Sequence, residues 1–142
     1  MGKIYYLMGK SGAGKDTLYR EILERTPRLK TVTLYTTRPI RDGEKDGVEY
    51  YFVSPDALTP YVQAGKVIEQ RTYHTMYGEW TYATIDDGQL DPENEDYLII
   101  GTLESYEKMK DYYGEKYLFP LYIEVEDGER LSRALLHSHN QM

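Results

Sequence analysis

A glycine-rich stretch near the start of the chain carries the residues best suited to chemistry. Residues 9–17 read GKSGAGKDT, which departs at one position from the phosphate-binding pattern G-x-x-x-x-G-K-[ST]. The glycines let backbone N–H groups converge on phosphate oxygens, and Lys15 adds a positive charge between the β- and γ-phosphates. The stretch therefore predicts an ATP site that consists of Gly9, Ser11, Gly12, Ala13, Gly14, Lys15, Asp16 and Thr17.

The departure is Asp16, which stands where a hydroxyl group normally ligates Mg²⁺. A carboxylate oxygen also suits Mg²⁺, so the sequence predicts Mg²⁺ as the cofactor, bound with ATP, and Asp16 as a direct or water-mediated ligand. Two alternatives stay open. Thr17 offers a hydroxyl ligand one position later, and Asp16 would stabilise a helix N-terminus in any case.

A strand and a helix must hold this loop between them. Residues 3–8 form an apolar run typical of a buried parallel strand, and residues 15–25 place apolar side chains on one helical face and stop before Pro27. Ser54-Pro55 predicts a further helix, in which Pro60 predicts a break. The remaining pattern predicts strands at 31–35, 49–53, 67–73, 79–85, 97–101 and 117–125, and helices at 103–113 and from Asp127.

Strands that alternate with helices predict an α/β fold with a mainly parallel sheet. We expect one domain over residues 1–142, with a small antiparallel insert at about residues 36–85. The acidic segment 86–96 is expected to be a loop.

The composition and charge of the chain limit the classes of molecule that we expect it to bind. The net charge of −7 argues against binding to nucleic acid. The charge is uneven, with a balance of +3 in residues 1–71 and −10 in residues 72–142, so an anionic ligand is expected on the N-terminal half. No apolar run approaches the length of a membrane span, and the chain has no Cys. We expect a cytoplasmic protein without a membrane partner; the sequence does not predict an oligomeric state.

Three blocks of the chain together resemble the guanylate kinase family. GKSGAGKDTL is similar to the phosphate loop of that family. Residues 35–54, YTTRPIRDGEKDGVEYYFVS, resemble its TTRxxRxxExxGxxYxFV block, and residues 67–78, VIEQRTYHTMYG, resemble the block that follows. The resemblance implies a P-loop kinase fold in three layers, with a nucleoside monophosphate-binding insert. It also implies the reaction GMP + ATP to GDP + ADP, with ATP and GMP as the small-molecule partners.

The resemblance also implies roles for single residues. Arg38 and Arg41 would clamp the phosphate of GMP, because the planar fork of arginine suits a phosphate group. Tyr50 and Tyr77 would donate hydroxyl hydrogen bonds to that phosphate, and Glu69 would accept from the guanine ring N–H and the exocyclic amine. The catalytic residues implied are Lys15, Arg38 and Arg133.

Some positions depart from the family. Leu34 and Glu79 replace serines on the guanine side, and Thr102, which completes the implied GMP-binding set, replaces an aspartate. Base recognition is therefore expected to rest mainly on Glu69. Residues 127–142 match only the start of an arginine-rich lid, and we expect the short lid to lower turnover more than GMP binding.

Two other functions fit part of the pattern. A phosphokinase acting on ribose 1,5-bisphosphate is favoured by Asp16, because the loop of such enzymes also resembles GxSGxGKD. It is disfavoured by Glu69, Tyr50 and the pair of Arg38 and Arg41. A non-catalytic guanylate-kinase-like binding module is favoured by the short C-terminus and disfavoured by the intact loop around Lys15.

Overall fold

The computed structural model describes residues 2–10 and 14–123. The chain folds as two compact units. The first, here called the core unit, comprises residues 1–31 and 92–142. The second, the insert unit, is Val32–Asp91 and contains the whole of the insert expected at residues 36–85. The helix expected from Asp127 lies outside the described residues.

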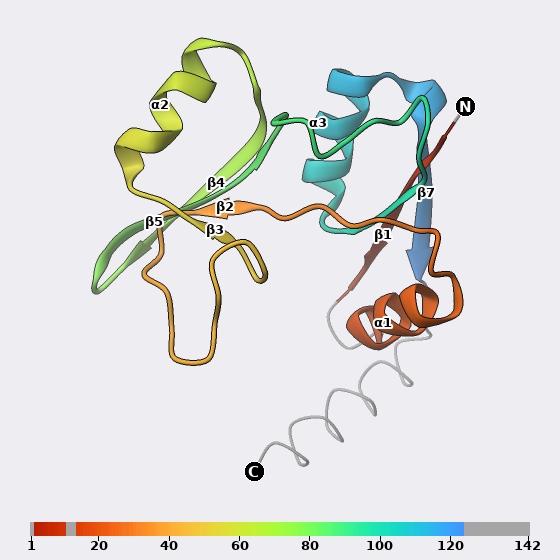
Figure 1. Cartoon of the computed structure of the whole chain (residues 1–142), viewed down its shortest axis with the longest axis horizontal. Helices are drawn as coiled ribbons and strands as arrows, with labels where there is room; N and C mark the ends of the chain where they lie inside the picture. The colour runs from red at the N-terminus through yellow and green to blue at the C-terminus, as the bar shows by residue number, and fades with distance from the viewer. Residues whose placement is uncertain (1, 11–13, 124–142) are drawn as a thin grey trace. The chain divides into compact units, whose positions relative to one another are not determined.

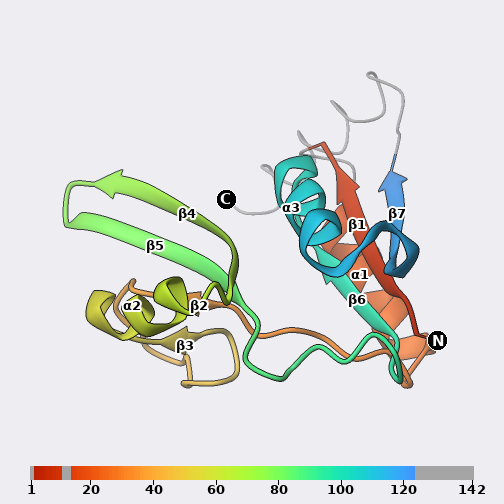
Figure 2. The same ribbon diagram turned by 90° about the horizontal axis from the view of Figure 1, so that it is seen from above.

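A parallel sheet forms the centre of the core unit. Strand β1 (Ile4–Gly9) lies between β6 (Tyr97–Ile100) and β7 (Leu118–Ile123), and both neighbours run parallel to it. Figure 1 shows β1 beside β7, and Figure 2 shows β6 on the other side of β1. Ile4 and Leu7 of β1 are fully buried, as expected for a strand that is covered on both faces. The predicted α/β class with a parallel core sheet is confirmed.

Helices α1 (Lys15–Arg25) and α3 (Leu103–Tyr113) complete the layers of this unit, and the short helix η1 (Glu115–Tyr117) leads from α3 into β7. The connection from β1 to β6 and the connection from β6 to β7 run in opposite directions across the sheet. Because such crossovers are right-handed, their helices, α1 and α3, lie on opposite faces of the sheet. Figure 2 shows α3 in front of the sheet and α1 behind it.

The insert unit is a mixed sheet covered by one helix. Its strands are β2 (Tyr35–Thr36), β3 (Tyr51–Phe52), β4 (Val67–Thr75) and β5 (Gly78–Ile85), in the order β3-β2-β5-β4. β5 runs antiparallel to β2 and β4, whereas β2 and β3 are parallel, so the small antiparallel insert that the sequence predicts also contains one parallel pair. Helix α2 (Pro55–Gln63) contributes Leu58 to a buried cluster that also contains Tyr35, Ala83 and Ile85.

Two local predictions were wrong. Of the strand expected at residues 31–35, only Tyr35 belongs to a strand, β2, and a single parallel bridge precedes this segment, between Lys30 and Tyr97. At Thr33 the side-chain amide of Gln89 takes the place of a strand partner. Gln89 accepts from the Thr33 N–H at 2.7 Å and donates to the Thr33 carbonyl at 2.9 Å.

The break expected at Pro60 is absent, since α2 runs through it. Pro60 removes one N–H donor from the helix, and the residue four positions earlier, Asp56, is exposed to water. The missing bond is therefore tolerated. None of the helices in the described part of the chain is long and apolar enough to cross a membrane.

Candidate functional site

The core unit holds the glycine-rich loop in the predicted context. β1 ends at Gly9 and α1 begins at Lys15, whose Nζ donates to the Gly9 carbonyl at 3.5 Å. Gly14 has a φ of 83°, a left-handed conformation that suits glycine, and its carbonyl accepts the Leu18 N–H at 3.0 Å. The structure therefore places a lysine and a helix N-terminus at the carboxyl end of a central strand.

Three of the predicted loop residues, Ser11, Gly12 and Ala13, lie outside the described residues, as does Arg133. Asp16 and Thr17 are both exposed in the first turn of α1. Within residues 2–10 and 14–123, no three acidic or histidine side chains gather as a metal site. Mg²⁺ is commonly held by one or two carboxylates together with substrate phosphates and water, and a single exposed carboxylate beside the loop fits that kind of binding.

In the insert unit, one face of the mixed sheet is turned away from α2. Paired positions on β4 and β5 place Glu69 opposite Thr84 and Arg71 opposite Tyr82. Thr36 of β2 also pairs with Tyr82. Neighbouring positions such as Tyr35 and Ala83 belong to the buried cluster with α2, and successive side chains alternate between the two faces of a sheet. We call this side, with Thr36, Phe52, Glu69, Arg71, Tyr73, Trp80, Tyr82 and Thr84, the outer face.

Arg38 lies next to the outer face and is already paired. Its side chain is only 4% exposed, and its two terminal nitrogens each donate to a carboxylate oxygen of Glu44 at 3.0 Å. Its guanidinium carbon lies 5.4 Å from the centre of the Tyr50 ring and 5.5 Å from that of Phe52. Glu44 also accepts the Arg41 N–H at 2.8 Å. The structure thus brings together Arg38 and Tyr50, whereas Arg41 is an exposed loop residue.

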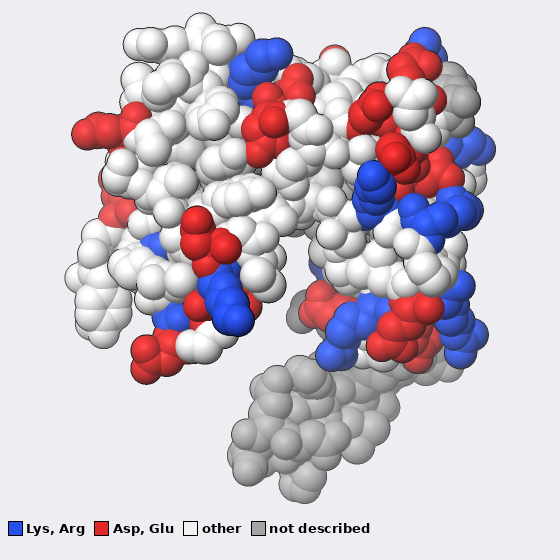
Figure 3. Space-filling model, viewed as in Figure 1, with Lys and Arg blue, Asp and Glu red and all other residues white. Residues whose placement is uncertain are grey.

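The pairing also changes how these groups titrate. The hydrogen bonds with Glu44 raise the pKa of Arg38, and the same bonds from Arg38 lower the pKa of the Glu44 carboxyl. Figure 3 shows acidic and basic side chains interleaved over the loop between β2 and β3. This loop therefore presents a bound charge pair instead of a surface of one sign.

Replacing Glu44 by Gln should change how the free energy of unfolding depends on pH. Because the carboxyl pKa is lowered from its ordinary 4.5 in the folded chain, the pair stabilises folding above pH 4.5 and this contribution is lost as the pH falls below that value. Urea unfolding between pH 3 and 6 should show a shallower loss of stability in Glu44→Gln than in the unaltered chain. Glu93→Gln, at an exposed position, is the control. Parallel curves for all three proteins would contradict the expectation.

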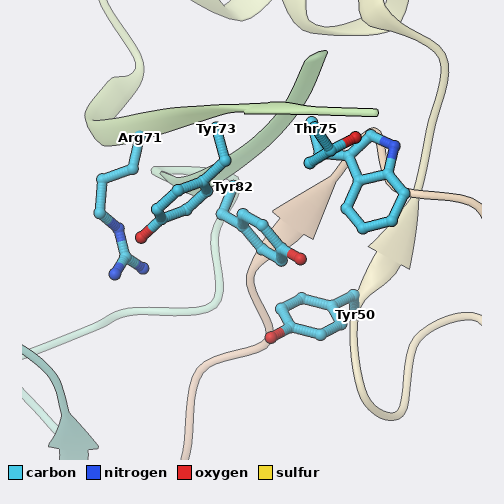
Figure 4. Close-up of a pocket in the computed structure, with 6 residues that line it drawn as sticks. Tyr50, Arg71, Tyr73, Thr75 and Tyr82 are labelled. Carbon is cyan, nitrogen blue, oxygen red and sulfur yellow. The ribbon is translucent and has the colours of Figure 1, made fainter. Parts of the chain in front are cut away.

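A cavity of about 400 Å³ opens on the outer face. Figure 4 shows the side chains that line it, namely Tyr50, Arg71, Tyr73, Thr75, Trp80 and Tyr82. The ring of Tyr82 packs edge to face against those of Tyr50 and Tyr73, with centroids 5.4 and 5.8 Å apart. Cavities of this size and aromatic character suit small-molecule ligands.

Glu69, the predicted guanine reader, lies on the same face. Its side chain is 5% exposed, Thr84 Oγ1 donates to its Oε1 at 3.1 Å, and Arg71 Nε lies 3.6 Å from its Oε2. Burying a carboxylate is costly unless it is paired and hydrogen-bonded, and here both conditions are met. A buried carboxylate beside a cavity is suited to accept hydrogen bonds from a ligand.

The remaining predicted residues lie elsewhere. Tyr77 is exposed in the turn between β4 and β5, where its ring stacks on Trp80 at 6.4 Å with an interplanar angle of 9°. Thr102 belongs to the core unit and caps α3. Its Oγ1 accepts the Ser105 N–H at 3.2 Å, and Ser105 Oγ accepts the Thr102 N–H at 3.0 Å.

The capping role of Thr102 leads to a prediction. Thr102→Ala removes the side-chain acceptor at the start of α3 and should lower the free energy of unfolding by about 1 kcal/mol. Thr102→Ser keeps the hydroxyl and should restore most of the loss. Urea unfolding of the three proteins checks this. An alanine variant as stable as the unaltered chain but weaker in binding GMP would show instead that Thr102 acts in ligand binding.

Several residues of the site were missed by sequence reasoning. Glu44 stands inside the quoted block at residues 35–54 but was given no role, although a carboxylate close to an arginine is a signal for pairing. The others are Arg71, Tyr73, Thr75, Trp80 and Tyr82, which line the cavity. The sequence signal for these residues is that they occupy every second position, counted from Glu69 along β4 and from Thr84 along β5. This spacing puts their side chains on one face of the sheet.

The parallel sheet with a helix on each face and the inserted mixed sheet define an α/β fold of the guanylate kinase type. A guanylate kinase structure from Anaplasma phagocytophilum superposes with a TM-score of 0.63 over 99% of this chain and 72% of that one, at 21% identity. Residues 1–87 match the family model described as guanylate kinase. The chain belongs to the guanylate kinase family.

Curated relatives give the extent of the similarity. A guanylate kinase from Frankia casuarinae is 42% identical over 78 residues, which cover 55% of this chain and 40% of that protein. One from Geobacter metallireducens is 32% identical over 131 residues, covering 91% of this chain and 63% of that protein. The chain therefore spans about half the length of these relatives.

Proposed function

We propose that this chain transfers the γ-phosphoryl group of ATP to GMP and forms ADP and GDP. The observation that carries the proposal is the grouping of a buried arginine, a tyrosine and a buried carboxylate, Arg38, Tyr50 and Glu69, around one face of the insert sheet. This set offers phosphate and base contacts in a chain of the guanylate kinase family.

On the acceptor side, Arg38 and Arg41 bind the phosphate of GMP, assisted by the hydroxyl groups of Tyr50 and Tyr77. Charge-assisted bonds from a guanidinium group to phosphate are among the strongest hydrogen bonds in proteins. Glu44 holds Arg38 in place before the ligand arrives, which lowers the entropy lost on binding. Glu69 accepts hydrogen bonds from the guanine base.

On the donor side, backbone N–H groups of the glycine-rich loop and the N-terminus of α1 hold the phosphates of ATP. Lys15 turns from the Gly9 carbonyl to the phosphates; the 3.5 Å contact is long for a hydrogen bond, so its loss costs little. Bound Mg²⁺ supplies positive charge on the phosphate oxygens. No residue need act as a general base, since the acceptor phosphate is already an anion. Arg133, with Lys15 and Arg38, completes the proposed catalytic set.

Asp16 is the proposed protein ligand to Mg²⁺, directly or through water. Asp16→Ala should weaken ATP binding measured with Mg²⁺ and leave GMP binding unchanged. Asp56→Ala, which removes an exposed carboxylate in the first turn of α2, is the matched control. Isothermal titration with each nucleotide separates the two sites. Equal weakening of ATP and GMP would point to a general loss of structure instead.

We also propose small nucleotides as the partners, with no nucleic acid or membrane partner, and a cytoplasmic location. The buried carboxylate of Glu69 supports an acceptor that carries a base over a sugar bisphosphate, because a second phosphate at that position would be repelled.

Phosphorus NMR tests the reaction itself. In a mixture of the full chain, ATP, MgCl₂ and GMP, the signals of GDP and ADP should grow together. Replacing GMP by ribose 1,5-bisphosphate should stop ADP formation. Absence of GDP under conditions in which both nucleotides bind would contradict the catalytic proposal and favour a binding module.

A further inference from the structure

We propose that Arg71 is a second base-recognition residue, which donates a hydrogen bond to the O6 atom of guanine while Glu69 accepts from the same base. This inference rests on the proposed binding of GMP. It assigns to this site a specificity residue for purines that carry a 6-oxo group.

The first support is the placement of the two side chains. Glu69 and Arg71 are two residues apart on β4 and share its outer face. Arg71 lines the cavity, and Figure 4 shows its guanidinium group at one end of the row of tyrosines. The Arg71 side chain is 37% exposed, compared with 5% for Glu69. Arg71 is therefore the more accessible of the two side chains on this face.

The second support is that the donors of Arg71 are not used up by Glu69. The distance from Arg71 Nε to Glu69 Oε2 is 3.6 Å, which is too long for a hydrogen bond. Nε is a buried atom and makes no hydrogen bond within the described part of the chain. A guanidinium group carries five N–H donors in a fixed plane. The ion pair thus orients Arg71 through Nε, and the terminal N–H groups, which this contact does not involve, are the donors offered to a ligand.

The third support is chemical complementarity. Guanine presents in sequence along one edge an acceptor, O6, and two donors, N1–H and the 2-amino group. Glu69 can accept from both donors, and Arg71 beside it donates to the adjacent O6. Arginine also pairs with O6 of guanine in nucleic-acid recognition. Adenine presents an amino group in place of O6 and has no 2-amino group, so it leaves both side chains poorly matched.

Arg71 is better placed for the base than for the phosphate. The proposed phosphate ligand Arg38 lies against Tyr50, and Tyr82 stands between them and Arg71, since Tyr82 pairs with Arg71 across the strands and packs on Tyr50.

The test compares two ligands that differ at the atom in question. 2-Aminopurine riboside 5′-monophosphate keeps the 2-amino group, ribose and phosphate of GMP but lacks O6 and N1–H. Dissociation constants for it and for GMP are measured by titration calorimetry on the unaltered chain and on Arg71→Ala. Gln70→Ala, at the next position and on the opposite face of β4, is the control. Arg71→Lys keeps the charge without the planar fork.

Arg71→Ala should weaken GMP binding about tenfold, within the range for one good base contact, and should change binding of the 2-aminopurine nucleotide less than about twofold on the same scale. Arg71→Lys should show the same selective loss to a smaller degree and decides the question if the alanine variant does not fold. Equal loss for both ligands, or no loss for either, would overturn the inference while GMP binding stands. Failure of the unaltered chain to bind GMP would overturn the proposed function as well.

Discussion

Lys15→Ala is expected to lower GDP formation by at least about 100-fold, the scale of losing one group that stabilises charge in a transition state. Lys15 is the first residue of α1, directly after the loop that follows β1, and its ammonium group is the proposed contact to the β- and γ-phosphates. The variant should also lose the thermal stabilisation given by ATP with Mg²⁺, while stabilisation by GMP stays unchanged.

The control for this variant is Lys108→Ala, which removes an exposed lysine of α3 in the same unit. It should keep both activity and ATP binding. A Lys15→Ala protein that folds and still forms GDP at the unaltered rate would show that the loop does not hold the transferred phosphate.

Arg38→Ala is expected to weaken GMP binding by about 30-fold or more, the scale of removing one partner of a buried, hydrogen-bonded charge pair. The guanidinium group is 4% exposed and lies against the rings of Tyr50 and Phe52, so water replaces it poorly. Binding of ATP should not change, because the loop belongs to the other unit. Titration calorimetry with each nucleotide measures both effects.

Arg28→Ala is the matched control, because Arg28 is also paired with a carboxylate, Asp96, but is 61% exposed and lies in the core unit. Arg38→Lys keeps a positive charge beside Glu44 and protects the fold. Unchanged GMP affinity in a folded Arg38→Ala protein would remove Arg38 from the acceptor site.

The sequence predicted the elements that carry strong local signals. The structure has α1 at Lys15–Arg25 and α3 at Leu103–Tyr113, the bounds expected from the position of apolar residues and from Pro27 and Gly114. The strands β4 and β5 were also predicted, at residues 67–73 and 79–85. In these segments local preference and tertiary packing agree.

Where local preference and tertiary packing disagree, tertiary contacts determine the structure. Gln89 lies far along the chain from Thr33 yet satisfies its backbone groups, and no local pattern reveals such a partner. The parallel pairing of β2 with β3 likewise depends on how a connection of 14 residues returns to the sheet.

The candidate site was only partly predictable for the same reason. Family blocks indicate Arg38, Tyr50 and Glu69, but not that Glu44 already occupies the fork of Arg38 or that Arg71 accompanies Glu69. Those contacts depend on the fold of one loop and on which strands pair. Thr102 differs from these residues, because the family resemblance indicated it for GMP binding, whereas the structure shows its side chain capping α3.

The most direct test of the account is the melting temperature of the chain with GMP and with AMP at equal concentration, since a ligand that binds only the folded state raises it. We predict that GMP raises the melting temperature of the unaltered chain, that AMP raises it far less, and that Arg38→Ala removes the effect of GMP. A melting temperature that GMP leaves unchanged, or raises no more than AMP does, would contradict the assignment of a GMP site to the outer face.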